Sequence, residues 1–111
     1  MLLYIFSFSG FAPTFAKRPV EELVYGGISG NASFTCHPDA APFPSFKWLK
    51  NGMELNLVPG DITSRIMMLA NGNLLITNVN SNDAGYYTCQ AENTFGTATS
   101  AGQLVISSKC Y

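Results

Sequence analysis

The sequence predicts an all-β fold, a sandwich of two antiparallel sheets with Greek-key connections. Apolar and polar residues alternate with period 2 in a series of short segments, as in strands that bury one face. Glycine, proline, asparagine and aspartate interrupt these segments about every 8–12 residues, and no segment carries a helical period. About seven short strands with such frequent turns are typical of a two-layered sandwich.

The clearest strand is expected over Gly85–Asn93, where Tyr87, Cys89 and Ala91 alternate with more polar residues. Further strands are expected at 30–36, 45–50, 65–69, 73–79 and 97–106, and residues 81–84 form at most one helical corner. The turn Asn71-Gly72 precedes the strand at 73–79. Small inward residues in the last strand allow the two sheets to approach closely: Ala98, Ser100 and Gly102.

Length and composition describe a single domain with few charges. The chain has 111 residues, of which 12% are charged, and its net charge is −1. The six lysines and arginines are scattered, so the sequence contains no basic stripe for nucleic acid or anionic lipid. The longest apolar run, at 1–8, is far shorter than the roughly 20 residues that span a bilayer. We therefore expect no nucleic-acid partner and no membrane contact by this domain itself.

The spacing of cysteine, tryptophan and tyrosine is the most specific signal. Cys36 and Cys89 occupy inward positions of predicted central strands, and Trp48 lies twelve residues after the first cysteine. This pattern resembles the core of an immunoglobulin domain, where a disulfide joins the sheets beside a buried tryptophan. Tyr87 is then placed to form a tyrosine corner, with its hydroxyl bonded to the backbone near Asp83. The alternative is an ordinary core tyrosine beside a free buried cysteine.

The resemblance extends over residues from about Ala12 to Ile106, which are similar to an intermediate-set (I-set) immunoglobulin domain. The matching motifs are Pro42-Phe43-Pro44 before Trp48, Leu74-x-Ile76-x-x-Val79, Asp83-x-Gly85-x-Tyr87-x-Cys89 and Ala91-Glu92-Asn93-x-x-Gly96. The interval from Cys36 to Cys89 is too short for the two extra strands of a variable domain. Within the I-set, the chain is particularly similar to contactins, which are neural adhesion proteins with several such domains. Its similarity to Sidekick-like and other cell-adhesion proteins is nearly as high. Ala41 stands where the family usually has glycine.

The resemblance also implies an ion pair between Arg65 and Asp83 at the bottom of the sandwich. The alternative is two separate surface charges, which would contribute under about 1 kcal/mol. The domain is expected at 12–107, residues 1–11 are a signal peptide or the remnant of preceding sequence, and 108–111 form a tail. Cys110, the third cysteine, is either an intermolecular bridge or a chance residue.

The compartment is predicted from a glycosylation signal and from the expected disulfide. Asn31-Ala32-Ser33 is the single N-glycosylation sequon in the chain, and Asn31 falls on the outward side of its strand. Sequons also occur by chance, so an unmodified Asn31 remains the alternative. A disulfide and a glycan on one domain both indicate the secretory pathway and an extracellular location.

A catalytic role is not supported by the residues present. The single histidine, His37, abuts Pro38 and Asp39 at a strand end, without a matched nucleophile or a carboxylate pair. These residues are also too few for a structural metal site with four ligands. The sequence therefore predicts a non-enzyme without a metal or another cofactor.

A protein-binding face is the remaining candidate for function. By strand phase, outward residues of one sheet include a candidate binding face of Tyr86, Leu49, Lys47, Thr88 and Gln90, flanked by Ser45, Thr97, Thr99 and Gln103. The other sheet is expected to expose Ile66, Met68 and Leu75. Loops or flanking domains that cover both faces are the alternative.

The expected function is adhesion or recognition in a contactin-like receptor, as a ligand-contacting or a spacer module. The partners would be other cell-surface or extracellular proteins, including a second copy of the same protein. Two alternatives are a structural I-set module of a titin-like cytosolic filament and a secreted single-domain binding protein. In the cytosolic filament the cysteines would be reduced.

Overall fold

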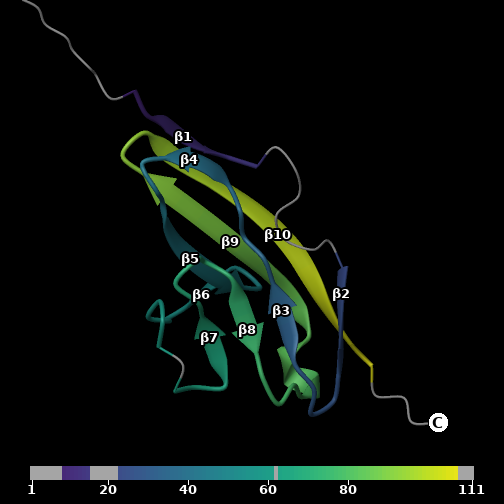
Figure 1. The fold of residues 1–111 in the computed structure, drawn as a ribbon. Helices are drawn as coiled ribbons and strands as arrows, with labels where there is room; N and C mark the ends of the chain where they lie inside the picture. Colours follow the sequence, from purple (N-terminus) through teal and green to yellow (C-terminus); the bar gives the residue numbers. More distant parts are fainter. Residues whose placement is uncertain (1–8, 16–22, 62, 108–111) are drawn as a thin grey trace, which may run out of the picture.

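The computed structural model describes residues 9–15, 23–61 and 63–107 as an immunoglobulin-like β-sandwich (Figure 1), which confirms the predicted fold class. Ten strands and one short 3₁₀ helix, η1, are present in these ranges. The elements are β1 (Phe11–Thr14), β2 (Leu23–Gly27), β3 (Ala32–Phe34), β4 (Asp39–Ala41), β5 (Ser45–Lys50), β6 (Met53–Leu55), β7 (Ile66–Met68), β8 (Leu74–Ile76), η1 (Ser81–Asp83), β9 (Gly85–Asn93) and β10 (Gly96–Ser107).

The strands form two facing layers that are joined by connections across the sandwich. The larger sheet has the order β2-β10-β9-β5-β6, and the smaller sheet has the order β3-β8-β7. In Figure 1, β1 and β4 lie at one end of the sandwich and η1 lies at the opposite end. We call these two regions the β1–β4 end and the η1 end. Residues 1–8 of the segment 1–11 that was predicted as a signal peptide or remnant lie outside the described residues, as does the predicted tail 108–111 with Cys110.

Two pairings depart from a purely antiparallel arrangement of two sheets. β2 pairs with β10 in parallel, with Leu23 opposite Gln103 and Gly27 opposite Ser107. β1 pairs with β4 as a separate antiparallel ribbon. Of the two N-terminal strands, β2 therefore extends the larger sheet, and β1 lies in the separate ribbon. β2 also covers a side of β10 that would otherwise be a free sheet edge.

The core is filled by side chains from the inner faces of both sheets. Phe34 of the smaller sheet packs on two aromatic residues of the larger sheet, with ring-centre distances of 5.1 Å to Tyr87 and 5.9 Å to Trp48. The other core members are aliphatic residues, sulfur-containing residues and one alanine: Ala32, Cys36, Met68, Leu74, Ile76, Val79, Cys89 and Leu104. Such interdigitation fixes the separation of the two sheets.

The prediction that Ile66 and Met68 are exposed on the smaller sheet is wrong. Met68 is 3% exposed and belongs to the core, and Ile66 packs against the core. The register explains this, because Met68 lies opposite Leu74 and Ile66 lies opposite Ile76, and directly opposed residues share one face of a sheet. The run from 65 to 69 contains no apolar–polar alternation, so its sequence alone did not fix the phase. Leu75 is half-buried.

The predicted turn at Asn71-Gly72 connects β7 to β8 and supports the core from the side. Gly72 has a φ of +98°, and a Cβ atom there would lie 2.9 Å from the Phe46 ring. Its carbonyl accepts a hydrogen bond of 2.7 Å from Nε1 of Trp48. Glycine is therefore required both for its backbone conformation and for the space that Phe46 occupies.

Candidate functional site

The two sheets are joined by the disulfide between Cys36 and Cys89. Both cysteines are fully buried, and their Cα atoms are 6.4 Å apart. Trp48 lies directly opposite Cys89 in the pairing of β5 with β9, and it is also fully buried. The indole nitrogen bonds to the backbone of the turn at Gly72, so burial leaves no polar atom of this side chain unsatisfied.

Tyr87 bridges from β9 to the corner formed by η1. Its ring is fully buried, and its hydroxyl donates a hydrogen bond of 2.6 Å to the carbonyl oxygen of Asp83. Burial, followed by the nearby charge of Asp83, raises the pKa of Tyr87 to about 12. This is the geometry of a tyrosine corner. The phenol is neutral at physiological pH and has a structural role.

Asp83 and Arg65 form a two-pronged ion pair at the η1 end. Nη1 of Arg65 lies 2.7 Å from Oδ2 of Asp83, and Nη2 lies 3.0 Å from Oδ1. Asp83 is only 2% exposed, and Oδ2 also accepts a hydrogen bond from the backbone nitrogen of Asn80. The hydrogen bonds from Arg65 lower the pKa of Asp83, although burial opposes this effect. A buried carboxylate with these partners remains ionised.

Backbone contacts hold the guanidinium group in place. Arg65 also donates to the carbonyl oxygens of Thr77 and Asn78, at 3.2 and 3.3 Å. Both the backbone nitrogen and the hydroxyl of Thr77 donate to the carbonyl of Arg65. Lys50 donates to the carbonyl of Asn82, next to Asp83. These contacts close the η1 end and leave the ion pair with a structural role, because its carboxylate is not accessible to a partner.

The outward surface of the larger sheet forms the candidate protein-binding face. Tyr86 is 59% exposed, and the half-buried Leu49 is its diagonal neighbour on β5. Across the strands the outward rows are Gln103–Tyr86, Ala101–Thr88–Leu49–Glu54, Thr99–Gln90–Lys47 and Thr97–Glu92–Ser45. We call this set of residues the Tyr86 face.

The Tyr86 face is rich in hydroxyl and amide groups, and its charged side chains are Lys47, Glu54 and Glu92. Lys47 lies 4.0 Å from Glu54, and both side chains are about half exposed, so the pair is weak. Sequence reasoning missed Glu54, because the short strand β6 gives little alternation, and it did not name Glu92 or Ala101. The period-2 phase of the predicted strands places both of these residues on the face.

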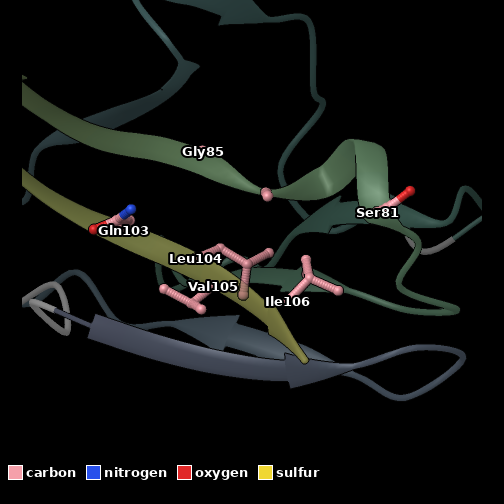
Figure 2. A pocket seen from close by; sticks show the side chains of 7 residues that line it. Ser81, Gly85, Gln103, Leu104, Val105 and Ile106 are labelled. Atoms are coloured by element: carbon pink, nitrogen blue, oxygen red, sulfur yellow. The ribbon is translucent and has the colours of Figure 1, made fainter. Parts of the chain in front are cut away.

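A shallow hollow lies between η1, the start of β9 and the last part of β10 (Figure 2). It has a volume of about 520 Å³, and its lining residues are Ser81, Ala84, Gly85, Gln103, Leu104, Val105 and Ile106. It forms because β10 continues beyond Gly85, the first residue of β9, which lies opposite Leu104. Gln103 lies opposite Tyr86 and also lines the hollow, so the two surfaces are continuous. The lining contains no ionisable side chain, which suits an apolar side chain of a partner rather than catalysis.

The β1–β4 end exposes aromatic side chains. Phe11 is 50% exposed, Phe43 is 73% exposed and Phe95 is 53% exposed. Nδ2 of Asn93 donates to the carbonyls of Phe11 and Pro42, at 2.9 and 3.1 Å, and its Oδ1 accepts from the backbone nitrogen of Phe95. One amide side chain thus ties together three segments that the sequence places far apart.

The described residues contain no group of side chains that could bind a metal ion. Within 9–15, 23–61 and 63–107, no three histidine, cysteine or acidic side chains gather as a metal site. His37 is exposed on the loop after β3.

Among the residues that the structure describes, no helix has the length and apolar character required to cross a bilayer. Asn31, the predicted glycosylation site, is exposed immediately before β3.

Comparison with known proteins identifies the family. The sequence model described as "Immunoglobulin I-set domain" matches residues 13–106, which include the disulfide, the tyrosine corner and the ion pair. The chain belongs to the immunoglobulin I-set family. Domains of this family are typically non-enzymatic binding modules.

Relatives of this I-set domain occur in different kinds of protein. Contactin-1 of Homo sapiens is 44% identical over 95 residues, which are 86% of this chain and 9% of that protein. The structure of extracellular domains 3–5 of Drosophila OTK matches 89% of this chain and 33% of that chain, with 27% identity and a TM-score of 0.75. A chimeric titin tandem matches 89% of this chain and 51% of that chain, with 27% identity and a TM-score of 0.76. This chain therefore spans a small part of the contactin it resembles.

Proposed function

We propose that this I-set domain binds another extracellular or cell-surface protein through the Tyr86 face, as one module of a contactin-like adhesion receptor. The observation that carries the proposal is that Tyr86 is 59% exposed on β9, and β9 pairs with β10 on one side and with β5 on the other. Exposed tyrosines are favoured anchors of protein interfaces, because they bury a large area and lose little conformational entropy. The similarity to Contactin-1 supports the adhesive class.

The chemistry of the face favours a neutral partner surface. Thr88, Gln90 and Gln103 present hydroxyl and amide groups that hydrogen-bond without strong electrostatic steering. The hollow lined by Gln103, which lies opposite Tyr86, offers space for one apolar side chain of the partner. Affinity for a single domain is expected to be about micromolar, and repeated copies on two facing cells would supply avidity.

An extracellular location agrees with the disulfide. A bond between Cys36 and Cys89 persists in the oxidising conditions of the secretory pathway and the cell surface, whereas cytosolic reductants keep such thiols reduced. The domain would therefore reach its partner after it has folded and oxidised in that pathway.

The test is binding of a clustered, fluorescent form of the 111-residue chain to cultured neurons, with and without protease treatment of the cell surface. Tyr86→Ala and Leu49→Ala are each expected to reduce binding about tenfold, because loss of an anchor removes more than about 1 kcal/mol. Phe43→Ala is the matched control, since Phe43 is more exposed than Tyr86 but lies at the β1–β4 end. Unchanged binding of both Tyr86→Ala and Leu49→Ala would contradict the proposal.

A second candidate is a structural module of a titin-like filament, supported by the similarity to the titin tandem. The same fold would then transmit force between neighbouring domains, and its cysteines would be reduced in the cytosol. Mass spectrometry of the endogenous protein separates the two candidates. Free thiols at Cys36 and Cys89 would favour the filament, and a bonded pair favours the receptor.

A further inference from the structure

The start of β3 presents the acceptor and the hydroxyl of the sequon on one accessible surface. Asn31 and Ser33 are both exposed, whereas Ala32 between them is 5% exposed and belongs to the core. Alternation along the strand thus directs Asn31 and Ser33 to the same outward side. Neither side chain makes a hydrogen bond or ion pair with any other residue that the structure describes. The folded domain therefore leaves the Asn31 amide accessible and has space for a group attached to it.

The backbone that carries Asn31 is held from both sides. Before it, the nitrogen of Ser29 donates to the carbonyl of Val79, and the nitrogen of Val79 donates to the carbonyl of Gly30. After it, Ala32 pairs with Ile76 of β8. A group attached to Asn31 would therefore have a defined position on the outward side of the smaller sheet, away from the Tyr86 face.

We propose that Asn31 carries an N-linked glycan and that this glycan covers the outward side of the smaller sheet. The second part of this inference depends on the proposed function, because it assigns protein binding to the opposite sheet. Ser33 lies opposite Leu75 on the outward surface of β3 and β8. A bulky, hydrated glycan beside this row excludes protein partners from it. The Tyr86 face is separated from it by the two sheet layers, about 10 Å apart, and remains open.

The chemical step is a transfer from an oligosaccharide joined to a lipid through pyrophosphate. Nδ2 of Asn31 attacks the first sugar carbon, and a carbon–nitrogen bond forms. The bond between that carbon and the pyrophosphate oxygen breaks, so the lipid pyrophosphate leaves with the bonding electrons. One amide proton of Asn31 is lost in the same exchange. No oxidant or reductant is consumed, and the secretory pathway supplies both the donor and the transferase.

The first experiment measures the modification. The 111-residue chain is fused to a secretion leader and secreted from mammalian cells. Its mass is measured by mass spectrometry before and after treatment with peptide-N-glycosidase. The untreated chain is expected to be heavier by one glycan, and treatment is expected to convert Asn31 to aspartate. Asn31→Gln and Ser33→Ala should abolish the mass difference, whereas Ser33→Thr should retain it. A secreted wild-type chain whose mass does not change on treatment would overturn the assignment.

The second experiment tests which face the glycan leaves open. Thr97→Asn creates a matched acceptor on the Tyr86 face, because Thr99 follows two residues later and both residues are exposed. Neuron staining by the clustered chain is expected to be lost in glycosylated Thr97→Asn, restored by the glycosidase, and unchanged in Asn31→Gln. Loss of staining in Asn31→Gln would overturn the proposal that the glycan and the protein partner occupy opposite faces of the sandwich.

The two proposals fail in different ways. A missing glycan with intact dependence on Tyr86 would remove only the modification. A glycosylated Asn31, together with staining that tolerates both Tyr86→Ala and a glycan introduced by Thr97→Asn, would instead remove the proposed binding face.

Discussion

The two ends of the sandwich are closed by different chemistry. At the η1 end, Asp83 is 2% exposed, and its carboxylate is bonded to Arg65 and to the backbone of Asn80. At the β1–β4 end, the amide of Asn93 joins the loops near the surface, and large aromatic side chains such as Phe43 remain exposed. The first end uses a buried charge, and the second uses neutral groups that are accessible to water.

This difference determines how well each end tolerates change. Removal of the buried Asp83 leaves the backbone nitrogen of Asn80 and the guanidinium of Arg65, whose side chain is 36% exposed, without their acceptor, and the free energy of unfolding is expected to fall by a few kcal/mol. Removal of a water-accessible amide allows water to replace the lost hydrogen bonds. The η1 end is therefore expected to maintain the fold, and the β1–β4 end is expected to accept substitutions.

The largest expected effect comes from loss of the disulfide that joins the two sheets. Simultaneous replacement of Cys36 and Cys89 by alanine removes a closed loop with a sequence separation of 53 residues. On the chain-entropy model, this lowers the free energy of unfolding by roughly 4 kcal/mol. Chemical denaturation of the variant and the oxidised wild type measures the difference. A loss below 1 kcal/mol would show that the facing sheets do not depend on this bridge.

The next largest effect is at the η1 end. Asp83→Ala is expected to lower the free energy of unfolding by about 3 kcal/mol, because the guanidinium of Arg65 and the backbone nitrogen of Asn80 lose their partner. Denaturant titration provides the measurement, and Glu54→Ala is a control, because Glu54 forms only an exposed pair at 4.0 Å. Equal stabilities of the two variants would mean that the Asp83 pair behaves as a surface pair.

The η1 end also predicts a dependence on pH. Because its ion pair lowers the pKa of Asp83, the carboxylate stabilises the fold above its unfolded value near 3.8, and this contribution disappears as pH falls through the lower folded value. Wild type is therefore expected to lose stability below about pH 4 more steeply than Asp83→Asn. Thermal unfolding of both proteins, measured at several pH values between about 2 and about 7, tests this prediction. Parallel curves for the two proteins would exclude Asp83 as the source.

The smallest expected effect is at the β1–β4 end. Asn93→Ala should lower the free energy of unfolding by only about 1 kcal/mol, although the side chain bonds to Phe11, Pro42 and Phe95. Its greater consequence should be local, with faster amide hydrogen exchange at Phe95, whose nitrogen loses an acceptor. A loss of stability as large as that of Asp83→Ala would remove the distinction between the two ends.

Much of the central sandwich was predictable from the sequence. The strands at 45–50 and 85–93 follow from alternation, and their bounds agree with β5 and β9. The helical corner at 81–84 corresponds to η1 at Ser81–Asp83. The outward phase of Tyr86 follows from the same alternation, so most of the candidate face could be named before the structure was known. In each case the local pattern and the tertiary environment favour the same arrangement.

The remaining elements depend on partners that are distant in the sequence. The parallel pairing of β2 with β10 and the ribbon of β1 with β4 have no local signature, because they are defined by strands elsewhere in the chain. The burial of Met68 was missed for the same reason, since the register with Leu74, and not the run of apolar residues around Met68, sets its direction. The hollow beside Gln103 arises from the unequal extents of β9 and β10.

The sequence by itself determined the fold class, the family and the inward direction of Cys36, Trp48, Tyr87 and Cys89, because period-2 alternation and fixed spacings are properties of a single strand or corner. The tertiary structure alone decided the register of the outer strands, the burial of Met68 and the hollow that extends the Tyr86 face. Those features depend on how separate strands align. Alignment is a balance of packing over the whole sandwich, which no single segment encodes.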